Sequence, residues 1–362
     1  MGASSSTPFH WLTILEQISQ QRRTLWPRLL GADVRRRQHP RGYFRALSSL
    51  PPHALSPPAR RDLRRIAVDV PRLCAPPSRH AACAQVVSAF TLHQLPPGGY
   101  LPAAALLAAA LLDALDDAEA AFWCLCALVD APHLFGGRVF GQPDFAQIVA
   151  FSHAVAQRLP QLARHMAAGG RAAFFDGQEH GLTALGAARW IGTLFAHGGG
   201  DNRLCHACID ACCVFGVEAA HLLALELLRR AEPRILRASE LEDVLDAPRA
   251  AEAEVSRSAA AMRQLMLGAF SSRAARKQMH LTTQCSLRQQ EAACAPHRFR
   301  ACVFASESRR WSVEMHPLCS EEVRSAVRAV LMLHRRDPRS SLFARLPYDL
   351  LIVRVLGAIA LA

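Results

Sequence analysis

The sequence predicts an all-α protein, because alanine and leucine dominate its 362 residues while only three tyrosines are present. Long runs rich in alanine and leucine favour helices over strands. Apolar residues make up 51% of the chain and charged residues 20%, a composition that excludes wholesale disorder and supports a large buried core. A chain of this length forms one large domain or two ordinary ones.

One face of residues 9–31 carries apolar side chains at helical spacing, so a helix is expected there. These side chains are Trp11, Ile14, Leu15 and Ile18. Residues 38–59 are rich in Pro, Ser and Gly and are expected to be a loop around a short helix at residues 43–47. The next helix is expected at residues 59–70, where Pro71 would end or bend it.

The middle of the chain alternates apolar helical stretches with turn signals. Two or three helices are expected in residues 81–129, with breaks at the LPPGG segment of residues 95–99 and at residues 113–117. Residues 130–144 are expected to be loop. Further helices are expected at residues 145–157, 162–166 and 184–196, one long apolar helix or a pair of them at residues 201–228, and two amphipathic helices at residues 231–260.

The pattern of apolar and polar residues changes after residue 285. Residues 298–305 and 310–315 alternate enough to predict a short hairpin. Ser320, followed by two glutamates, indicates the start of another helix. We therefore expect an N-terminal segment of residues 1–20, a helical domain of residues 21–250, a helical linker of residues 251–284, and a small helical or α+β extension of residues 285–362.

Positive charge is concentrated near the N-terminus. The whole chain has a net charge of +12, and residues 1–80 hold fourteen arginines against four acidic residues, a net charge of +10. Such a surface suits an anionic membrane or an acidic protein. Nucleic acid is not expected, because no aromatic residues are interleaved with the basic clusters. Arginine is also simply the usual cation of this chain, which has Lys277 as its one lysine.

The first residues, MGASSST, match the N-myristoylation pattern, with Gly2 as the acceptor once Met1 is removed. Serine-rich N-termini also match this pattern by chance. A single myristoyl chain binds membranes only marginally, and a basic patch is the usual second signal. The arginines that would supply it are Arg22, Arg23, Arg28, Arg35, Arg36 and Arg37. The expected location is cytoplasmic and peripheral on membranes.

No secretory signal or membrane span is expected. The N-terminus lacks an apolar stretch after a basic start. The best candidate span, residues 100–112, is shorter than the roughly 20 apolar residues a transmembrane helix needs, so it is expected to be a core helix. The twelve cysteines are then expected to be reduced thiols that pack as small apolar groups.

Two short motifs occur intact in the first part of the chain. R-x-x-x-W is formed by Arg22 and Trp26 within RRTLWPRLLG, and I-x-x-D-x-x-R is formed by Ile66, Asp69 and Arg72 within RRIAVDVPR. In order and spacing they resemble two of the three signature motifs of the TBC domain, the helical module of Rab GTPase-activating proteins.

The third signature of that family, Y-x-Q, is degenerate here. Tyr100 matches its tyrosine, but Pro102 stands at the glutamine position. Further stretches are similar to the family at residues 119–123 (EAAFW), residues 159–165 (LPQLARH) and residues 190–196 (WIGTLFA), and Asp210 falls where the family often has a Trp-Asp pair. The resemblance covers about residues 20–245.

The resemblance implies an all-α, multi-helix TBC-like fold and a GTP-bound Rab-type small GTPase as the partner, in vesicle trafficking, with no cofactor. It implies Arg72 as the catalytic arginine supplied in trans and Asp69 as the residue that orients it. Arginine suits this role because its planar guanidinium stays charged and binds phosphate oxygens in a bidentate way. Members of the R-x-x-x-W, I-x-x-D-x-x-R and Y-x-Q motifs that would bind the partner or hold the site are Arg22, Trp26, Ile66 and Tyr100.

Pro102 cannot do what the family's glutamine does, because it has no side-chain hydrogen-bonding group and no backbone N–H. Two functions therefore stay open. One is a GTPase-activating protein that relies on Arg72. The other is a catalytically impaired member that binds a Rab protein as a scaffold or effector. Simpler interpretations also stay open, with Arg72 as an ordinary surface arginine and Tyr100 as a residue that closes a turn.

The densest group of metal-ligand types lies in residues 205–213. It consists of Cys205, His206, Cys208, Cys212 and Cys213. Such a group can hold zinc, but three of the cysteines recur on one face of a helix, from which four ligands rarely converge. Core packing is the favoured interpretation, and no metal is expected. The chain has no P-loop and no G-x-S-x-G frame.

Overall fold

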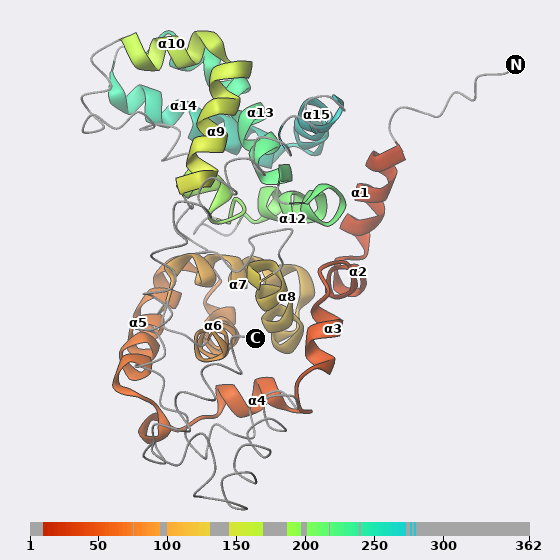
Figure 1. The fold of residues 1–362 in the computed structure, drawn as a ribbon, viewed down its shortest axis with the longest axis vertical. Helices are drawn as coiled ribbons and strands as arrows, with labels where there is room; N and C mark the ends of the chain where they lie inside the picture. The colour runs from red at the N-terminus through yellow and green to blue at the C-terminus, as the bar shows by residue number, and fades with distance from the viewer. Residues whose placement is uncertain are drawn as a thin grey trace, which may run out of the picture.

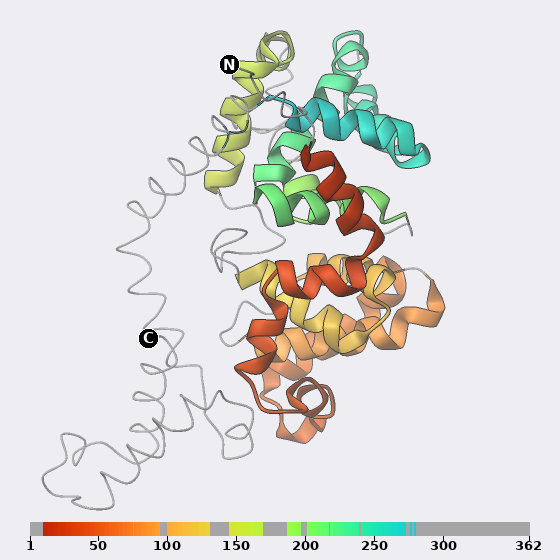
Figure 2. The same ribbon diagram turned by 90° about the vertical axis from the view of Figure 1, so that its right-hand side faces the viewer.

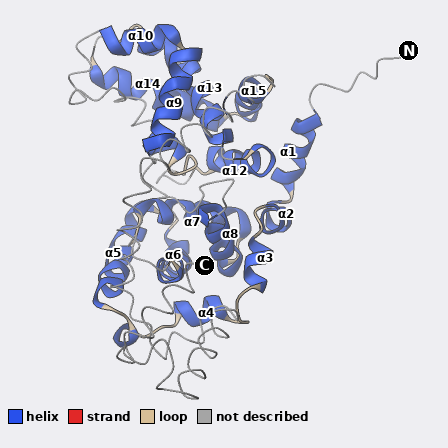
Figure 3. Cartoon of the chain, viewed as in Figure 1, coloured by secondary structure: helices blue, strands red, loops and turns tan. Residues whose placement is uncertain are grey.

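The computed structural model describes most of the chain up to residue 279. The described residues are 10–74, 76–94, 100–130, 145–168, 187–196, 201–216, 218–238, 240–272, 276 and 279. Throughout these residues the regular structure is helical and contains no strand (Figure 3). The all-α prediction is therefore confirmed.

Eight α-helices make up the first part of the fold. They are α1 (His10–Gln20), α2 (Arg22–Leu29), α3 (Ala32–Arg37), α4 (Tyr43–Ser48), α5 (Pro57–Leu73), α6 (His80–His93), α7 (Pro102–Leu115) and α8 (Ala118–Asp130). The described helices of the second part are α9 (Phe145–Arg158), α10 (Pro160–Ala168), α12 (Arg203–Phe215), α13 (Glu218–Ile235), α14 (Leu241–Arg257) and α15 (Ala259–Phe270), with a π-helical turn at Ala187–Ile191.

The helices gather in two groups along the longest axis of the molecule (Figure 1). The lower group contains α4 to α8, in which α6 contacts α5, α7 and α8. The upper group contains α9, α10 and α13 to α15. The helix α12 lies between the groups and contacts α1, α2, α7 and α13. The helices α1 to α3 run along one side, which faces the viewer in Figure 2.

The core runs through both groups. In the lower group α7 and α8 are almost entirely buried, so the apolar segment expected to be a core helix is α7. The largest fully buried side chains include Trp26, Phe122 and Phe151. In the upper group the buried carboxylate of Glu252 accepts hydrogen bonds from Arg189 and from the indole of Trp190, which ties α14 to the π-helical turn.

Several local predictions differ from the structure. Within the described residues, the helix expected over residues 184–196 is only the π-helical turn Ala187–Ile191, followed by a turn in which Leu194 and Phe195 have positive φ values of 49° and 62°. The helix expected over residues 9–31 is two helices separated at Gln21, and Ile14 is exposed where Leu12 is buried. The helix α5 does not end at Pro71 but continues to Leu73. A proline in a last turn removes only one hydrogen bond, here the one to the Ala67 carbonyl, and the buried contacts of the helix outweigh this loss.

The expected domain boundaries divide elements that pack together. The boundary at residue 250 falls inside α14, and residues 251–284 contain α15. Leu265, Met266 and Phe270 of α15 are buried in the same core as the rest of the fold. The breaks at residues 95–99 and 131–144, the hairpin of residues 298–315, and the helix after Ser320 lie outside the described residues.

Candidate functional site

The helix α5 presents the second motif. Its first turn is capped by the Ser56 hydroxyl, which accepts a hydrogen bond from the Ala59 N–H at 3.4 Å. Ile66 and Val70 are buried and fix the helix against α6 and α7. Arg72 lies in the last turn with an exposed side chain. Among the described residues nothing forms an ion pair or a hydrogen bond with its guanidinium, which is therefore open to a partner.

Tyr100 lies against the same end of α5. The ring is buried, and the Arg65 guanidinium lies over it at 5.9 Å from the centroid. Burial is the main cause that raises the pKa of the Tyr100 hydroxyl above its usual value, and the negative charge of Asp69 is the second cause. The hydroxyl is buried and has no hydrogen-bond partner among the described residues, although the Asp69 carboxylate lies near enough for its charge to act on it.

Asp69 does not hold Arg72 in the way the sequence suggested. We expected the carboxylate to orient the guanidinium, because the two residues are three positions apart on one helix. Within the described residues no ion pair joins them, and the charge of Asp69 acts on Tyr100. Asp69 of the second motif thus acts on Tyr100, the residue of the third motif that this chain keeps.

The start of α7 lies beside the end of α5. The Cys74 thiol, two residues after Arg72, donates to the Ala105 carbonyl at 3.4 Å and contacts the Cys83 sulfur of α6 at 3.2 Å. Ala105 belongs to the first turn of α7, which begins at Pro102. Together with the approach of Tyr100 to Asp69, this contact places Arg72 and Pro102 at one end of the helical group.

Pro102 serves the start of its helix. It occupies the first helical position after Leu101, where a missing N–H costs nothing because the first N–H groups of a helix have no intrahelical acceptor. Its side chain is exposed. A glutamine at this position would offer an amide to the same surface, whereas the pyrrolidine ring offers no hydrogen bond. The arrangement therefore presents one polar side chain, Arg72, where the family pattern has two.

The first motif joins α2 to α12, the helix that lies between the two helical groups. Arg22 donates to the Asp210 carboxylate with Nη2–Oδ2 at 2.6 Å and Nε–Oδ1 at 3.1 Å, and the Trp26 indole donates to Oδ1 at 2.8 Å. Burial raises the pKa of Asp210, while the hydrogen bonds and charge of Arg22 oppose this change. Trp26 is fully buried. Among the described residues, the whole motif therefore faces Asp210 of α12.

His206 completes this contact and was not assigned a role from the sequence. Its Nε2 atom lies 2.8 Å from the Ala110 carbonyl of α7, and its ring packs edge-on against Trp26. Because a carbonyl only accepts, Nε2 carries the proton of this hydrogen bond. Burial is the main cause that lowers the pKa of His206. The neutral ring joins α12 to α7, a contact that helical periodicity alone does not reveal.

The cysteines around His206 belong to the core. Cys205, Cys208 and Cys212 are buried in α12, and burial raises the pKa of the Cys205 and Cys208 thiols. No group of three or more metal-ligand side chains is arranged to hold an ion in the part of the chain that the structure describes.

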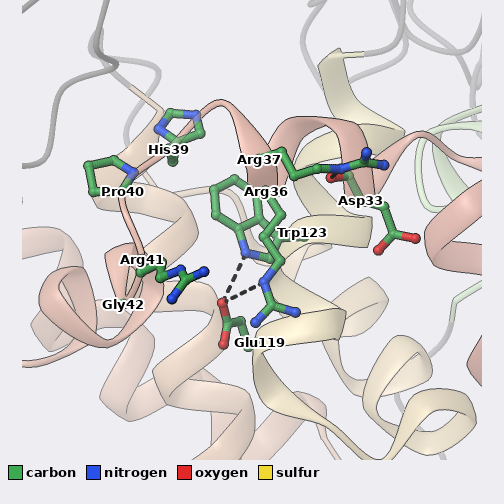
Figure 4. A pocket seen from close by; sticks show the side chains of 9 residues that line it. All are labelled: Asp33, Arg36, Arg37, His39, Pro40, Arg41, Gly42, Glu119 and Trp123. Atoms are coloured by element: carbon green, nitrogen blue, oxygen red, sulfur yellow. Dashed lines mark hydrogen bonds and ion pairs between the residues drawn. The ribbon is translucent and has the colours of Figure 1, made fainter.

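A pocket of 680 Å³ lies between α3 and α8, on the other side of the lower group from α5 (Figures 1 and 4). Three arginines and two acidic residues line it, with His39, Pro40, Gly42 and Trp123. The Glu119 carboxylate pairs with Arg36 at 3.1 Å and accepts from the Trp123 indole at 3.4 Å (Figure 4). The helices α3 and α8 that line the pocket lie apart from α5, which carries Arg72, so the pocket is separate from the candidate site (Figure 1).

Comparisons with known proteins show the family and the fold of the chain. The family model of the Rab-GTPase-TBC domain matches residues 19–236. The chain is similar in structure to a flagellar RabGAP TBC domain of Chlamydomonas, with a TM-score of 0.56 and 22% sequence identity, over 74% of this chain and 85% of that chain. At this level of identity the likeness shows the fold alone. No curated protein matches the chain.

Proposed function

Because the chain belongs to the Rab-GTPase-TBC domain family, we propose that it accelerates GTP hydrolysis by a Rab-type small GTPase, with Arg72 supplied in trans. One observation carries this proposal. Arg72 is exposed in the last turn of α5, the end that lies against Tyr100 and the start of α7, and has no ion-pair partner among the described residues. An arginine held in this way is free to enter the nucleotide site of another protein.

The chemical contribution of Arg72 is electrostatic. Negative charge on the transferring phosphoryl group in the transition state limits the reaction. An arginine supplied by a second protein stabilises this charge and raises the rate of hydrolysis by a factor of roughly 10³–10⁵. The guanidinium stays charged and donates two parallel hydrogen bonds to phosphate oxygens. The chain offers no side chain at position 102 to orient the attacking water. This proposal therefore requires that a glutamine of the GTPase itself orients it.

Pro102 supports a second candidate function. If the GTPase depends on its partner for the water-orienting amide, this chain binds the GTP-bound form without accelerating hydrolysis. It then acts as a scaffold or effector in membrane trafficking. Both candidates use the same surface and differ only in the chemical step.

A membrane location belongs to the same proposal. None of the described helices is long and apolar enough to cross a membrane. We propose a cytoplasmic protein that is held on membranes by acylation of Gly2 and by the N-terminal arginines. Gly2 lies outside the described residues.

A single-turnover hydrolysis assay on a panel of GTP-loaded Rab proteins separates the two functions. The native chain is compared with Arg72→Ala, Arg72→Lys and the control Arg45→Ala, an exposed arginine of α4. Acceleration that both Arg72 variants lose and the control keeps supports the first function. Complex formation without acceleration supports the scaffold. Acceleration that survives Arg72→Ala would exclude the arginine from the reaction.

A further inference from the structure

The outer face of α5 carries a row of arginines that leads to Arg72. The row consists of Arg60, Arg61, Arg64, Arg65 and Arg72, with Val68 among them, and all six side chains are exposed. At 3.6 residues per turn they fall within an arc of about 140°. The arc lies opposite Ile66 and Val70, which are buried. We call these six residues the arginine row.

The arginine row has no charge of opposite sign within its arc. The two acidic residues of α5, Asp62 and Asp69, lie at its edge and are half-buried. Among the described residues, none of the arginines in the row forms an ion pair, and Arg65 alone contacts a ring, that of Tyr100. Several arginines elsewhere do pair with a carboxylate, among them Arg22, Arg36 and Arg189.

Within the row, arginines of like charge are neighbours on the helix surface. Arg60 and Arg64 are four residues apart, as are Arg61 and Arg65, and like charges at this spacing repel along a helix. Val68 adds an apolar side chain that is 51% exposed, one turn before Arg72. Charge without counter-charge, beside an exposed apolar residue, is the composition of a surface that a partner neutralises and covers.

We propose that the arginine row is the docking surface for an acidic face of the GTPase, an inference that rests on the proposed function. The partner would present carboxylates along about 18 Å, the rise of α5 from Arg60 to Arg72, and an apolar contact for Val68. Because Arg72 ends the row, docking along it brings the partner's nucleotide to the arginine. Charge complementarity of this kind raises association rate constants by a factor of about 10 to 10³.

The test compares two double charge reversals in the full chain. Arg60→Glu with Arg64→Glu reverses the far end of the row and leaves Arg72 intact. Arg41→Glu with Arg45→Glu reverses two exposed arginines with the same spacing outside α5. Association rates are measured with Rab proteins that carry a non-hydrolysable GTP analogue, at low and high salt. Circular dichroism checks that each variant keeps the helix content of the native chain. A third variant, Arg60→Gln with Arg64→Gln, removes the two charges without reversing them.

We expect the reversal in the row to slow association about tenfold or more at low salt, with a smaller loss at high salt. The control should change the rate by roughly twofold or less, and the glutamine pair should fall between. Equal losses in both reversals, or no loss in the row, would overturn the inference. So would binding of anionic vesicles or duplex DNA that depends on the row while GTPase binding does not.

Hydrolysis measured on the same samples separates this inference from the proposed function. Binding that depends on the row, without acceleration, supports the docking surface and contradicts the activating role. Acceleration that depends on Arg72 but survives the reversal of Arg60 and Arg64 supports the activating role and overturns the docking surface. Failure of every Rab protein in the panel to bind would contradict both.

Discussion

Replacing Asp210 with alanine should destabilise the fold more than any other single change in the contact between α2 and α12. The carboxylate is 3% exposed and accepts hydrogen bonds from Arg22 and Trp26, which lie 188 and 184 residues away in sequence. The alanine variant leaves the buried indole N–H of Trp26 without an acceptor. It also leaves the guanidinium of Arg22 without its counter-ion.

The expected magnitude follows from these two losses. A buried donor without a partner costs about 1–3 kcal/mol, and removal of one partner of a buried ion pair costs about 3–5 kcal/mol. The two losses share one cause, so their free energies do not add. The Arg22 side chain is 24% exposed, so water replaces part of the lost interaction. We expect a loss of about 3 kcal/mol in the free energy of unfolding for Asp210→Ala. Asp210→Asn keeps an acceptor for Trp26 and should lose about half as much.

Equilibrium unfolding in urea measures these losses, followed by circular dichroism and tryptophan fluorescence. The native chain, both Asp210 variants, Arg22→Ala and the double variant Arg22→Ala with Asp210→Ala complete a cycle. The double variant should lose much less than the sum of the two single losses, because the residues share one interaction. A loss below about 1 kcal/mol for Asp210→Ala would refute the reasoning. So would additive losses in the cycle.

Three further outcomes are expected. Pro102→Gln should raise single-turnover GTP hydrolysis above that of the native chain, since the side chain at position 102 is exposed at the start of α7; an unchanged rate would show that position 102 does not reach the water. The fold should lose stability as pH falls below about 6.5, because burial lowers the pKa of His93 to about 3 and also lowers that of His206. Both rings stay neutral in the folded chain while the unfolded chain takes up protons. His93→Phe should flatten this slope in unfolding curves recorded against pH, and an unchanged slope would assign it to other groups. Gly2→Ala should shift the protein from the membrane to the soluble fraction in cell fractionation, whereas an unchanged distribution would exclude an acyl anchor.

Local sequence patterns predicted the helices well where a helix has one buried face and a clear boundary. The break between α7 and α8 is an example. Asp116 adopts a left-handed conformation with φ of 56°, and the Asp117 carboxylate caps α8 by accepting from the Ala120 N–H at 2.7 Å. Pro71 misled the same reasoning. A local rule ends the helix there, but the burial of Val70 and the contact of Cys74 with Ala105 hold it to Leu73.

The roles within the motifs were less accessible to the sequence. Arg22 and Trp26 stood out as a motif, and Asp210 fell at a position similar to one in the family, but nothing in the spacing joined them. The expected link from Asp69 to Arg72 was argued from helix geometry, yet the charge of Asp69 acts on Tyr100. A contact between helices depends on how their faces pack, and a pattern within one helix carries no information about that.

By itself the sequence determined that this chain is helical, that its apolar segment of residues 100–112 is buried, and that its motifs are those of a TBC domain whose glutamine is missing. Only the tertiary structure decided that Arg72 is exposed, that Pro102 lies at the same end of the fold, and that the first motif binds Asp210. The physical reason is the separation in sequence over which each kind of interaction acts. Helix periodicity and capping act over a few residues, whereas these decisions depend on contacts between side chains up to 188 residues apart.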